Sequence, residues 1–292
     1  MKRKVALIAD GPAAVPQALV DEYDIRVLPL HVIDNGHDYL ETEVDMAWLL
    51  ARLQQKADLP TTSSASVGET LQCYEWAAQR ADAAISIHLS SAFSKSYGAA
   101  LEARALALER YPHMQIEVID SQTAEAGELL ITVEAARLAT QGASFNEVVR
   151  HAYRVRDSLC LFYCLETLFY RDKGGRIFKA KPWAEAERRS GTDFKALTRV
   201  DYSTGGIVKP VSRAKSKKQL LKRMAQMASE QVKGRRLSGA IVHVNADRDV
   251  ACLQEMLRHE VLCDGVYVSH ASAGSTIHSG EGFVSFGFCA KD

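Results

Sequence analysis

The segment Ala83-Ala84-Ile85-Ser86-Ile87-His88-Leu89 and the turn Ser90-Ser91-Ala92-Phe93-Ser94-Lys95-Ser96 that follows it decide the fold. The first is a short apolar run with the character of a buried strand. An alanine-rich helix is predicted after the turn, over Tyr97–Leu108, and Ile116–Ile119 predicts the next strand. Two strands joined through a helix of this length lie parallel in one sheet. The segment therefore predicts an α/β unit whose first strand ends in a hydroxyl-rich turn.

The same alternation of strands and helices continues on both sides of this unit. Thr42 is expected to cap a helix that begins near Met46, and Ser144 with Glu147 forms a capping box for another. The further elements predicted in this half are strands at Val5–Ala9 and Ile25–Val32 and helices at Met46–Leu53, Leu71–Ala78, Leu129–Leu138 and Ser144–Val155. This order predicts a mostly parallel sheet with helices on both faces.

The pattern of alternating apolar strands and helices ends near residue 156. A strand is predicted at Leu159–Cys164, but the stretch from there to about Gly206 is charged and is expected to be loop-rich. The later predicted elements are helices at Ser216–Glu230 and Val250–Leu257 and strands at Ala240–Val244, Gly265–Ser269 and Phe283–Phe288. We therefore expect an N-terminal α/β domain over residues 1–155, a C-terminal α/β domain over residues 156–292, and a cleft between them.

Composition limits the classes of function. The chain has 292 residues, 47% of them apolar, and 36 basic residues balance 36 acidic ones. No broad field favours nucleic acid or an anionic membrane. The six cysteines contain no CxxC pair, as expected in a reducing compartment. The apolar run after the N-terminal basic residues ends at Asp10, and no run reaches the roughly 18 residues of a membrane span. We expect a cytoplasmic protein without stable membrane insertion.

Two hydroxyl-rich turns carry the strongest functional signal. The first contains Thr61, Thr62, Ser63, Ser64 and Ser66, and the second is the Ser90–Ser96 turn. Each precedes a predicted helix, whose first N–H groups are unpaired and attract anions. Either turn alone is explained by simple helix capping. Together they supply more hydroxyl groups than two caps need, at strand ends where α/β sheets place ligands, and they predict a carboxylate site without a resident cation.

A few basic side chains are further candidates. Arg176 follows the paired glycines Gly174-Gly175, and Arg213 lies in a small-residue segment, so either could contact a carboxylate or phosphate, or could be solvated at the surface. His270 ends a predicted strand and is the first candidate for proton or phosphate chemistry, although such a histidine is often structural. His278 is the weaker candidate. We predict no metal site, because no matched carboxylate or cysteine spacing accompanies the histidines.

Several short segments together resemble the DegV family of bacterial lipid-binding proteins, which includes the fatty-acid-binding subunit of bacterial fatty acid kinase. The resemblance runs nearly end to end. It is carried by Asp10, Pro60-Thr61-Thr62-Ser63, Leu89-Ser90-Ser91-Ala92-Phe93-Ser94, Val118-Ile119-Asp120-Ser121, Leu168, Lys173-Gly174-Gly175-Arg176-Ile177, Phe194-Lys195-Ala196-Leu197, Arg213 and His270. No GxSxG elbow, P-loop or GxGxxG motif competes with it.

The resemblance implies a two-domain α/β fold that holds one long-chain fatty acid in an internal tunnel, with the carboxylate at the interdomain cleft. By position, Thr62 and Ser94 would contact the carboxylate, and their neighbours Thr61, Ser63 and Ser91 would support them. The implied partner is a separate dihydroxyacetone-kinase-like fatty acid kinase that phosphorylates the bound carboxylate. His270 is also implied to be a lipid-binding residue, and the phosphoryl transfer would be assisted by Arg176, Arg213 and His270. The chain itself would be a binding protein, with no catalytic residue and no cofactor.

Some residues depart from the family pattern, and they bear more on phosphoryl transfer than on lipid binding. They are Gly11, Ala65, Lys95, Ala196, Ser272 and Ala273. Two alternatives therefore stay open. One is a stand-alone enzyme that uses His270 and Arg176 on a small acidic metabolite in the interdomain cleft. The other is a lipid carrier that has no kinase partner.

Overall fold

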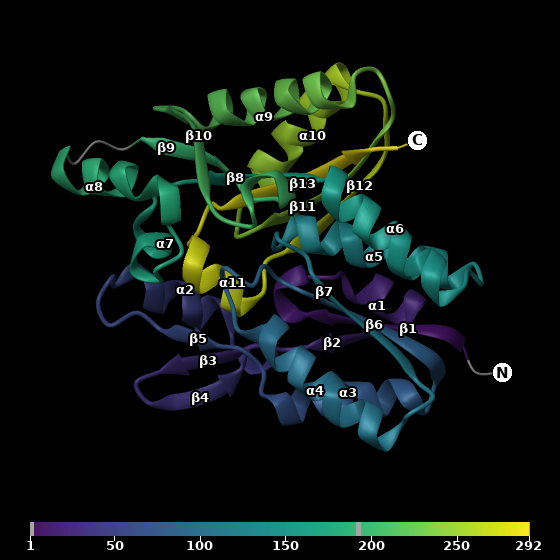
Figure 1. Ribbon diagram of the computed structural model, residues 1–292. Coiled ribbons are helices and arrows are strands. Elements are labelled where there is room, and N and C mark those ends of the chain that lie inside the picture. The colour runs from purple at the N-terminus through teal and green to yellow at the C-terminus, as the bar shows by residue number, and fades with distance from the viewer. Residues whose placement is uncertain (1–2, 191–193, 292) are drawn as a thin grey trace.

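The computed structural model describes residues 3–190 and 194–291. A four-stranded parallel sheet in the order β2-β1-β6-β7 forms the first layer (Figure 1). Its strands are β1 (Arg3–Asp10), β2 (Ile25–Leu28), β6 (Ala81–His88) and β7 (Gln115–Asp120). Helices cover both faces, with α3 (Val67–Ala78) and α4 (Ser96–Arg110) on one face and α1 (Gln17–Tyr23) and α5 (Ala126–Thr140) on the other. The parallel α/β layer predicted from the sequence is confirmed.

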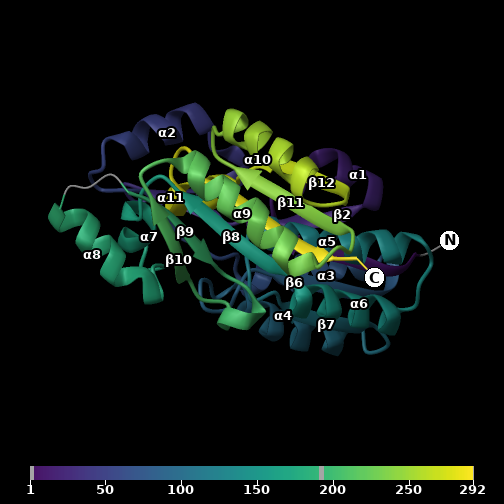
Figure 2. The same ribbon diagram turned by 90° about the horizontal axis from the view of Figure 1, so that it is seen from above.

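A six-stranded sheet in the order β10-β9-β8-β13-β11-β12 forms the second layer. Its strands are β8 (Cys160–Leu165), β9 (Lys195–Arg199), β10 (Lys209–Ala214), β11 (Leu237–His243), β12 (Cys263–His270) and β13 (Val284–Ala290). Only β11 and β12 pair in parallel among its described strands. Figure 2 shows α9 (Lys217–Val232) and α10 (Asp247–Glu260) lying over the outer side of this sheet. Helices α5 and α6 (Phe145–Ser158) lie on its inner side.

A small antiparallel sheet, β4-β3-β5, changes two expectations. It consists of β3 (His31–Asp34), β4 (His37–Leu40) and β5 (Thr61–Ser63). The single strand expected at Ile25–Val32 is wrong in extent, because the chain leaves the first sheet at Pro29 and enters this one. Pro29 has no N–H group with which to continue a strand ladder, and it lies where the chain passes from β2 to β3. The first hydroxyl turn is therefore partly a strand, β5.

The structure corrects three further local predictions. The charged stretch expected to be loop-rich contains α7 (Phe169–Lys173), α8 (Lys181–Ser190) and β9. The small-residue turn after His270 is a helix, α11 (Ala273–Ser279). Asp45, not Thr42, caps α2 (Met46–Gln54), because its carboxylate accepts a hydrogen bond from Trp48 N at 2.7 Å.

Helix α5 joins the two layers. It packs against β1 on one side and against β11 and β13 on the other (Figure 1). At the closest point, a Cβ atom on Gly287 would lie 2.8 Å from backbone atoms of Ala126 and Gly127, so only glycine permits this approach. Side chains from before and after residue 156 share one apolar core, and the domain boundary there stays a prediction. In the part of the chain that is described, no helix is both long and apolar enough to cross a bilayer.

Glu128 on α5 is fully buried, which predicts a pH dependence of stability. Burial, and after it the charges of Asp10 and Glu125, raise the pKa of Glu128 well above its ordinary value. The folded state then binds a proton that the unfolded state releases above about pH 4.5. The contribution of Glu128 protonation to the free energy of unfolding is complete below that pH. It is lost as the pH rises toward the folded-state pKa. We expect Glu128→Gln to flatten this fall between pH 5 and 8, measured by thermal unfolding. An equally steep fall in the variant would contradict the assignment.

Candidate ligand-binding site

Two carboxylates, the buried Asp10 and the half-buried Asp120, hold the turn that follows β6. Asp10 accepts a hydrogen bond from Leu89 N (3.1 Å) and pairs with His88 Nδ1 (2.8 Å). Asp120, at the end of β7, accepts from the Ser91 hydroxyl at 2.6 Å. Both acids lie at the carboxyl edge of the parallel sheet, where an α/β fold places its ligand site. They fix the backbone between β6 and α4, on which Ser94 lies.

Strand β5 and helix α11 bring a second hydroxyl to the same place. Thr62 is half-buried and its Oγ1 lies 2.8 Å from His278 Nε2. Thr61 and Ser63 are exposed, because side chains of a strand alternate between its two faces. Thr61 lines a neighbouring hollow beside Tyr170 instead. Of the two threonines predicted in this turn, only Thr62 lines the cavity that Ser94 also lines.

Arg176 completes the group. Its Nε donates to the Phe93 carbonyl (3.1 Å), Nη1 lies 2.8 Å from His278 Nδ1, and Nη2 donates weakly to Thr62 Oγ1 (3.4 Å). A Cβ atom on Gly174 would lie 2.5 Å from His278 Nδ1, so the glycine leaves room for the histidine. Burial, and then the charge of Arg171, lower the pKa of Arg176 to about 10. Arg176 therefore remains charged at neutral pH.

His278 remains uncharged. Burial, then the charges of Arg176 and Arg171, lower its pKa well below the ordinary value. A neutral imidazole can accept from an arginine and bond a hydroxyl at the same time. His278 therefore links Arg176 to Thr62 and holds both at the site.

These side chains share one cavity. Its polar lining is Thr62, Ser63, Ser64, Ser94, Glu125, Arg171, Arg176, Ser275 and His278, and its apolar lining is Pro12, Leu30, Leu89, Phe93, Ala124 and Gly274. The volume is about 30 Å³, far below the roughly 300 to 1,000 Å³ of usual ligand pockets. The expected tunnel is not open here, and a ligand of more than a few atoms must displace side chains of the wall.

The cavity also contains charge that the sequence did not lead us to expect. Arg171 and Glu125 are buried in its wall, and Arg171 Nη2 lies 3.5 Å from Glu125 Oε1. With Arg176, the described lining holds two guanidinium groups against one carboxylate. The expectation of an anion site without a resident cation is therefore wrong. A ligand that carries a single negative charge would neutralise the cavity.

The remaining predicted site residues lie outside the cavity. Ser91 faces an open hollow that Ser63, Ser64 and Ser94 also line. Arg213 lies on β10 with its guanidinium 4.7 Å from the Trp183 ring. Arg213 does not line the cavity of Arg176.

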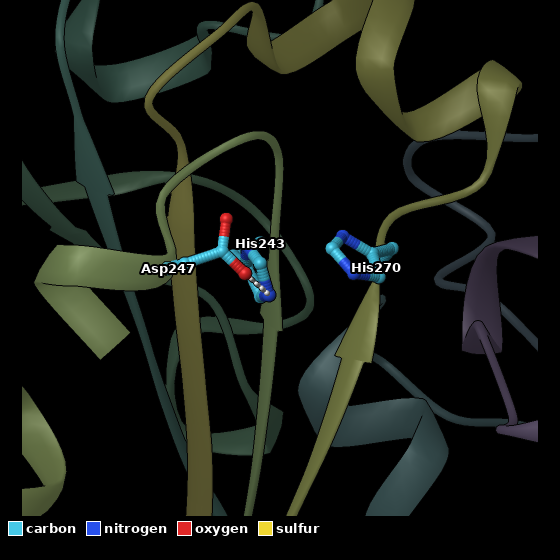
Figure 3. A group of neighbouring side chains, drawn as sticks. All are labelled: His243, Asp247 and His270. Atoms are coloured by element: carbon cyan, nitrogen blue, oxygen red, sulfur yellow. Dashed lines mark ion pairs between the residues drawn. The ribbon is translucent and has the colours of Figure 1, made fainter. Parts of the chain in front are cut away.

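His270 lies at the end of β12, beside His243 rather than Thr62. Figure 3 shows the two rings on neighbouring strands, with Asp247 at the start of α10. The ring centroids are 4.4 Å apart, and the ligand atoms of the three residues lie within 4.8 Å of one another. His243 Nδ1 accepts a hydrogen bond from Ala246 N (3.2 Å), so the neutral ring carries its proton on Nε2. His243 Nε2 lies 4.0 Å from Asp247 Oδ1, which is within ion-pair range but too far for a hydrogen bond.

Sequence reasoning missed two charged cavity residues, Glu125 and Arg171, and it ranked His278 below His270. The signal for His278 was its spacing, since Gly274, Ser275 and His278 share one face once α11 is recognised as a helix. Glu125 adopts a positive φ of 43° before α5. No sequence pattern predicts this conformation for a glutamate.

Two departures from the family pattern have local structural explanations. A Cβ atom on Gly11 would lie 1.7 Å from Glu41 Oε1, so the buried Glu41 requires glycine there. Glu41 in turn accepts from Leu30 N and Gly274 N, at 2.7 and 3.2 Å. Ser272 caps α11 by accepting from Ser275 N. Both departures therefore help to place α11 against β3, next to the cavity.

Comparisons with known proteins agree with this architecture. Protein DegV of Bacillus subtilis is 25% identical over 293 residues, covering 98% of this chain and 99% of that protein. A DegV family protein from Thermus thermophilus, described as binding fatty acid, superimposes with a TM-score of 0.88 at 24% identity, with both chains fully covered. A stearic-acid-binding protein from Eubacterium ventriosum gives a TM-score of 0.85 at 20% identity over 98% of each chain. At these identities the two solved structures show a shared fold.

The sequence also matches a family model. The model is described as "Uncharacterised protein, DegV family", and it aligns with residues 4–291. The match spans all three sheets and every residue of the cavity, so this chain belongs to the DegV family.

Proposed function

We propose that this chain binds a fatty acid and holds its carboxylate with Thr62, Ser94 and Arg176. The observation that carries the proposal is the meeting of these three side chains in one cavity whose described charges leave one positive charge in excess. Hydrogen bonds from hydroxyl and guanidinium groups offset the desolvation of a carboxylate. Family relatives that are described as binding fatty acids support the same ligand class.

The acyl chain would supply most of the affinity. Each buried methylene contributes about 0.8 kcal/mol, before the cost of ordering the chain. Because the cavity is small, the bound state must include movement of wall side chains, and part of the gain offsets that rearrangement. We also propose that the bound fatty acid has a long acyl chain.

Presentation to a separate kinase is the second part of the proposal. Ser63, Ser64 and Ser94 line both the cavity and the outer hollow, which also contains Lys95 and Tyr97. A kinase seated over this hollow would reach a carboxylate at the cavity mouth. We expect acyl phosphate to form when the loaded protein is mixed with ATP and a dihydroxyacetone-kinase-like fatty acid kinase. No product with an active kinase would favour a carrier that has no kinase partner.

A stand-alone enzyme is less well supported. That alternative needs His270 and Arg176 in one cleft, but His270 lies beside His243 and does not line the cavity of Arg176.

Ser94→Ala tests the site directly. The loss of a hydroxyl that bonds a buried carboxylate should weaken fatty acid binding by about 1 to 3 kcal/mol, or roughly 5- to 150-fold. Titration calorimetry would measure the change after native mass spectrometry has identified any acyl chain that copurifies. Thr61→Ala is the control, because Thr61 lies outside this cavity. Equal affinity of the wild type and Ser94→Ala would place the carboxylate elsewhere.

A further inference from the structure

The inner wall of the cavity is polar beyond the carboxylate site. Glu125 and Arg171 are only 4% and 2% exposed, and both line the cavity. Arg171 Nη2 donates to Ser279 Oγ at 3.0 Å, and the Tyr163 hydroxyl donates to Glu125 Oε2. A plain acyl chain against this wall would cover a guanidinium and a carboxylate with methylene groups and give them no new partner.

One hydrogen-bond donor of Arg171, its Nε–H group, is not used within the part of the protein that the structure describes. Its Nε is buried and has no hydrogen-bond partner among the described residues. The guanidinium plane is fixed by stacking, with its carbon 4.2 Å from the Tyr163 ring centroid and 5.5 Å from that of Phe283. A buried donor without a partner is costly, and an oxygen atom of a ligand would remove that cost.

The charges of the lining identify the kind of oxygen. Arg171 and Arg176 are countered by Glu125 alone among the charged residues that line the cavity, and His278 is neutral. One ligand carboxylate balances this set. A second carboxylate beside Arg171 would leave the buried site with a negative charge, whereas a hydroxyl or keto oxygen adds an acceptor without adding charge.

We infer that this chain selects a carboxylic acid that carries a hydroxyl or keto oxygen a few bonds from its carboxylate, and that Arg171 binds this second oxygen. The inference rests on the proposed function, because the carboxylate is held by the same Thr62, Ser94 and Arg176. The two groups of the ligand are close together because one small cavity is lined by both arginines. Arg171 is then a specificity-determining residue.

The test compares acids that differ by one oxygen atom. Delipidated full-length protein is titrated with 3-hydroxydecanoate and decanoate, and with 3-hydroxypalmitate and palmitate. We expect each hydroxylated acid to bind at least about tenfold tighter than its parent, the size of effect seen when a buried donor gains a partner. Equal or tighter binding of the parent acids would overturn this inference and leave the proposed function standing. Binding of none of the four acids would overturn both.

A paired replacement gives the reciprocal test. Glu125→Leu with Arg171→Leu removes both charges together, so neither ion is left buried without its counter-charge, although the Tyr163 and Ser279 hydroxyls each lose one hydrogen bond. We expect this double variant to lose the preference for hydroxylated acids and to bind decanoate more tightly than the wild type does. Glu134→Leu with Arg137→Leu is the matched control, because it removes an ion pair of α5 outside the cavity. A double variant at Glu125 and Arg171 that keeps the full hydroxyl preference would overturn the role of Arg171. The wild-type titrations decide the question without any variant.

Discussion

Arg176→Met is expected to weaken fatty acid binding by about 30-fold or more. Removing one partner of a buried, hydrogen-bonded charge pair costs roughly 2 to 5 kcal/mol. Arg176 donates a hydrogen bond to Thr62 Oγ1, and it also reaches the turn of Ser94 through the Phe93 carbonyl. The variant therefore loses both the charge and the contact that joins the two hydroxyl elements. Titration calorimetry with the acid that binds the wild type best measures the effect.

The stability of unliganded Arg176→Met should change little. Burial and Arg171 both disfavour the charged guanidinium, as its lowered pKa shows. Relief of this repulsion offsets the hydrogen bonds that are lost. Arg213→Met is the matched control, since Arg213 stacks on Trp183 outside the cavity, and it should bind the acid normally. If Arg176→Met binds as tightly as the wild type, the carboxylate does not contact Arg176.

Arg171→Leu is expected to lower the free energy of unfolding by about 3 to 5 kcal/mol. The substitution leaves Glu125 buried without its cation, and breaking a buried ion pair from one side has this cost. Chemical denaturation followed by circular dichroism measures the change.

The double variant at Glu125 and Arg171 should recover most of this loss, because neither charge remains. Arg258→Leu is the control for the single variant. Arg258 pairs with Glu255 at the surface, where ion pairs contribute about 1 kcal/mol or less. A loss below about 1 kcal/mol in Arg171→Leu would mean that Glu125 does not depend on Arg171.

The parallel layer follows from local patterns in the sequence. Apolar runs of strand length alternate with helical periodicity from Val5 to Ile119, and the structure has β1, β6 and β7 where these runs were predicted. The position of Ser94 after β6 follows from the same pattern. Where local signals were weak, the predictions failed, as at the break after Pro29 and in the short helix α11.

Local sequence patterns could not predict which residues form the cavity wall, because those residues are far apart in the chain. Arg171 and Glu125 are 46 residues apart, Arg176 and His278 are 102 apart, and Thr62 and His278 are 216 apart. The sequence ranked His270 above His278, but the geometry of β12 and α11 turns His270 toward His243 and His278 toward Thr62.

The sequence by itself determined the alternating α/β framework and the two hydroxyl turns, because strand and helix periods and capping residues act over a few neighbouring positions. Helix α7 packs against α11, and Arg171 of α7 pairs with Glu125 at the start of α5, and these contacts decided which charges enter the cavity. Such contacts depend on how distant elements meet, and only the folded chain brings Arg171, Arg176 and Glu125 into one buried space.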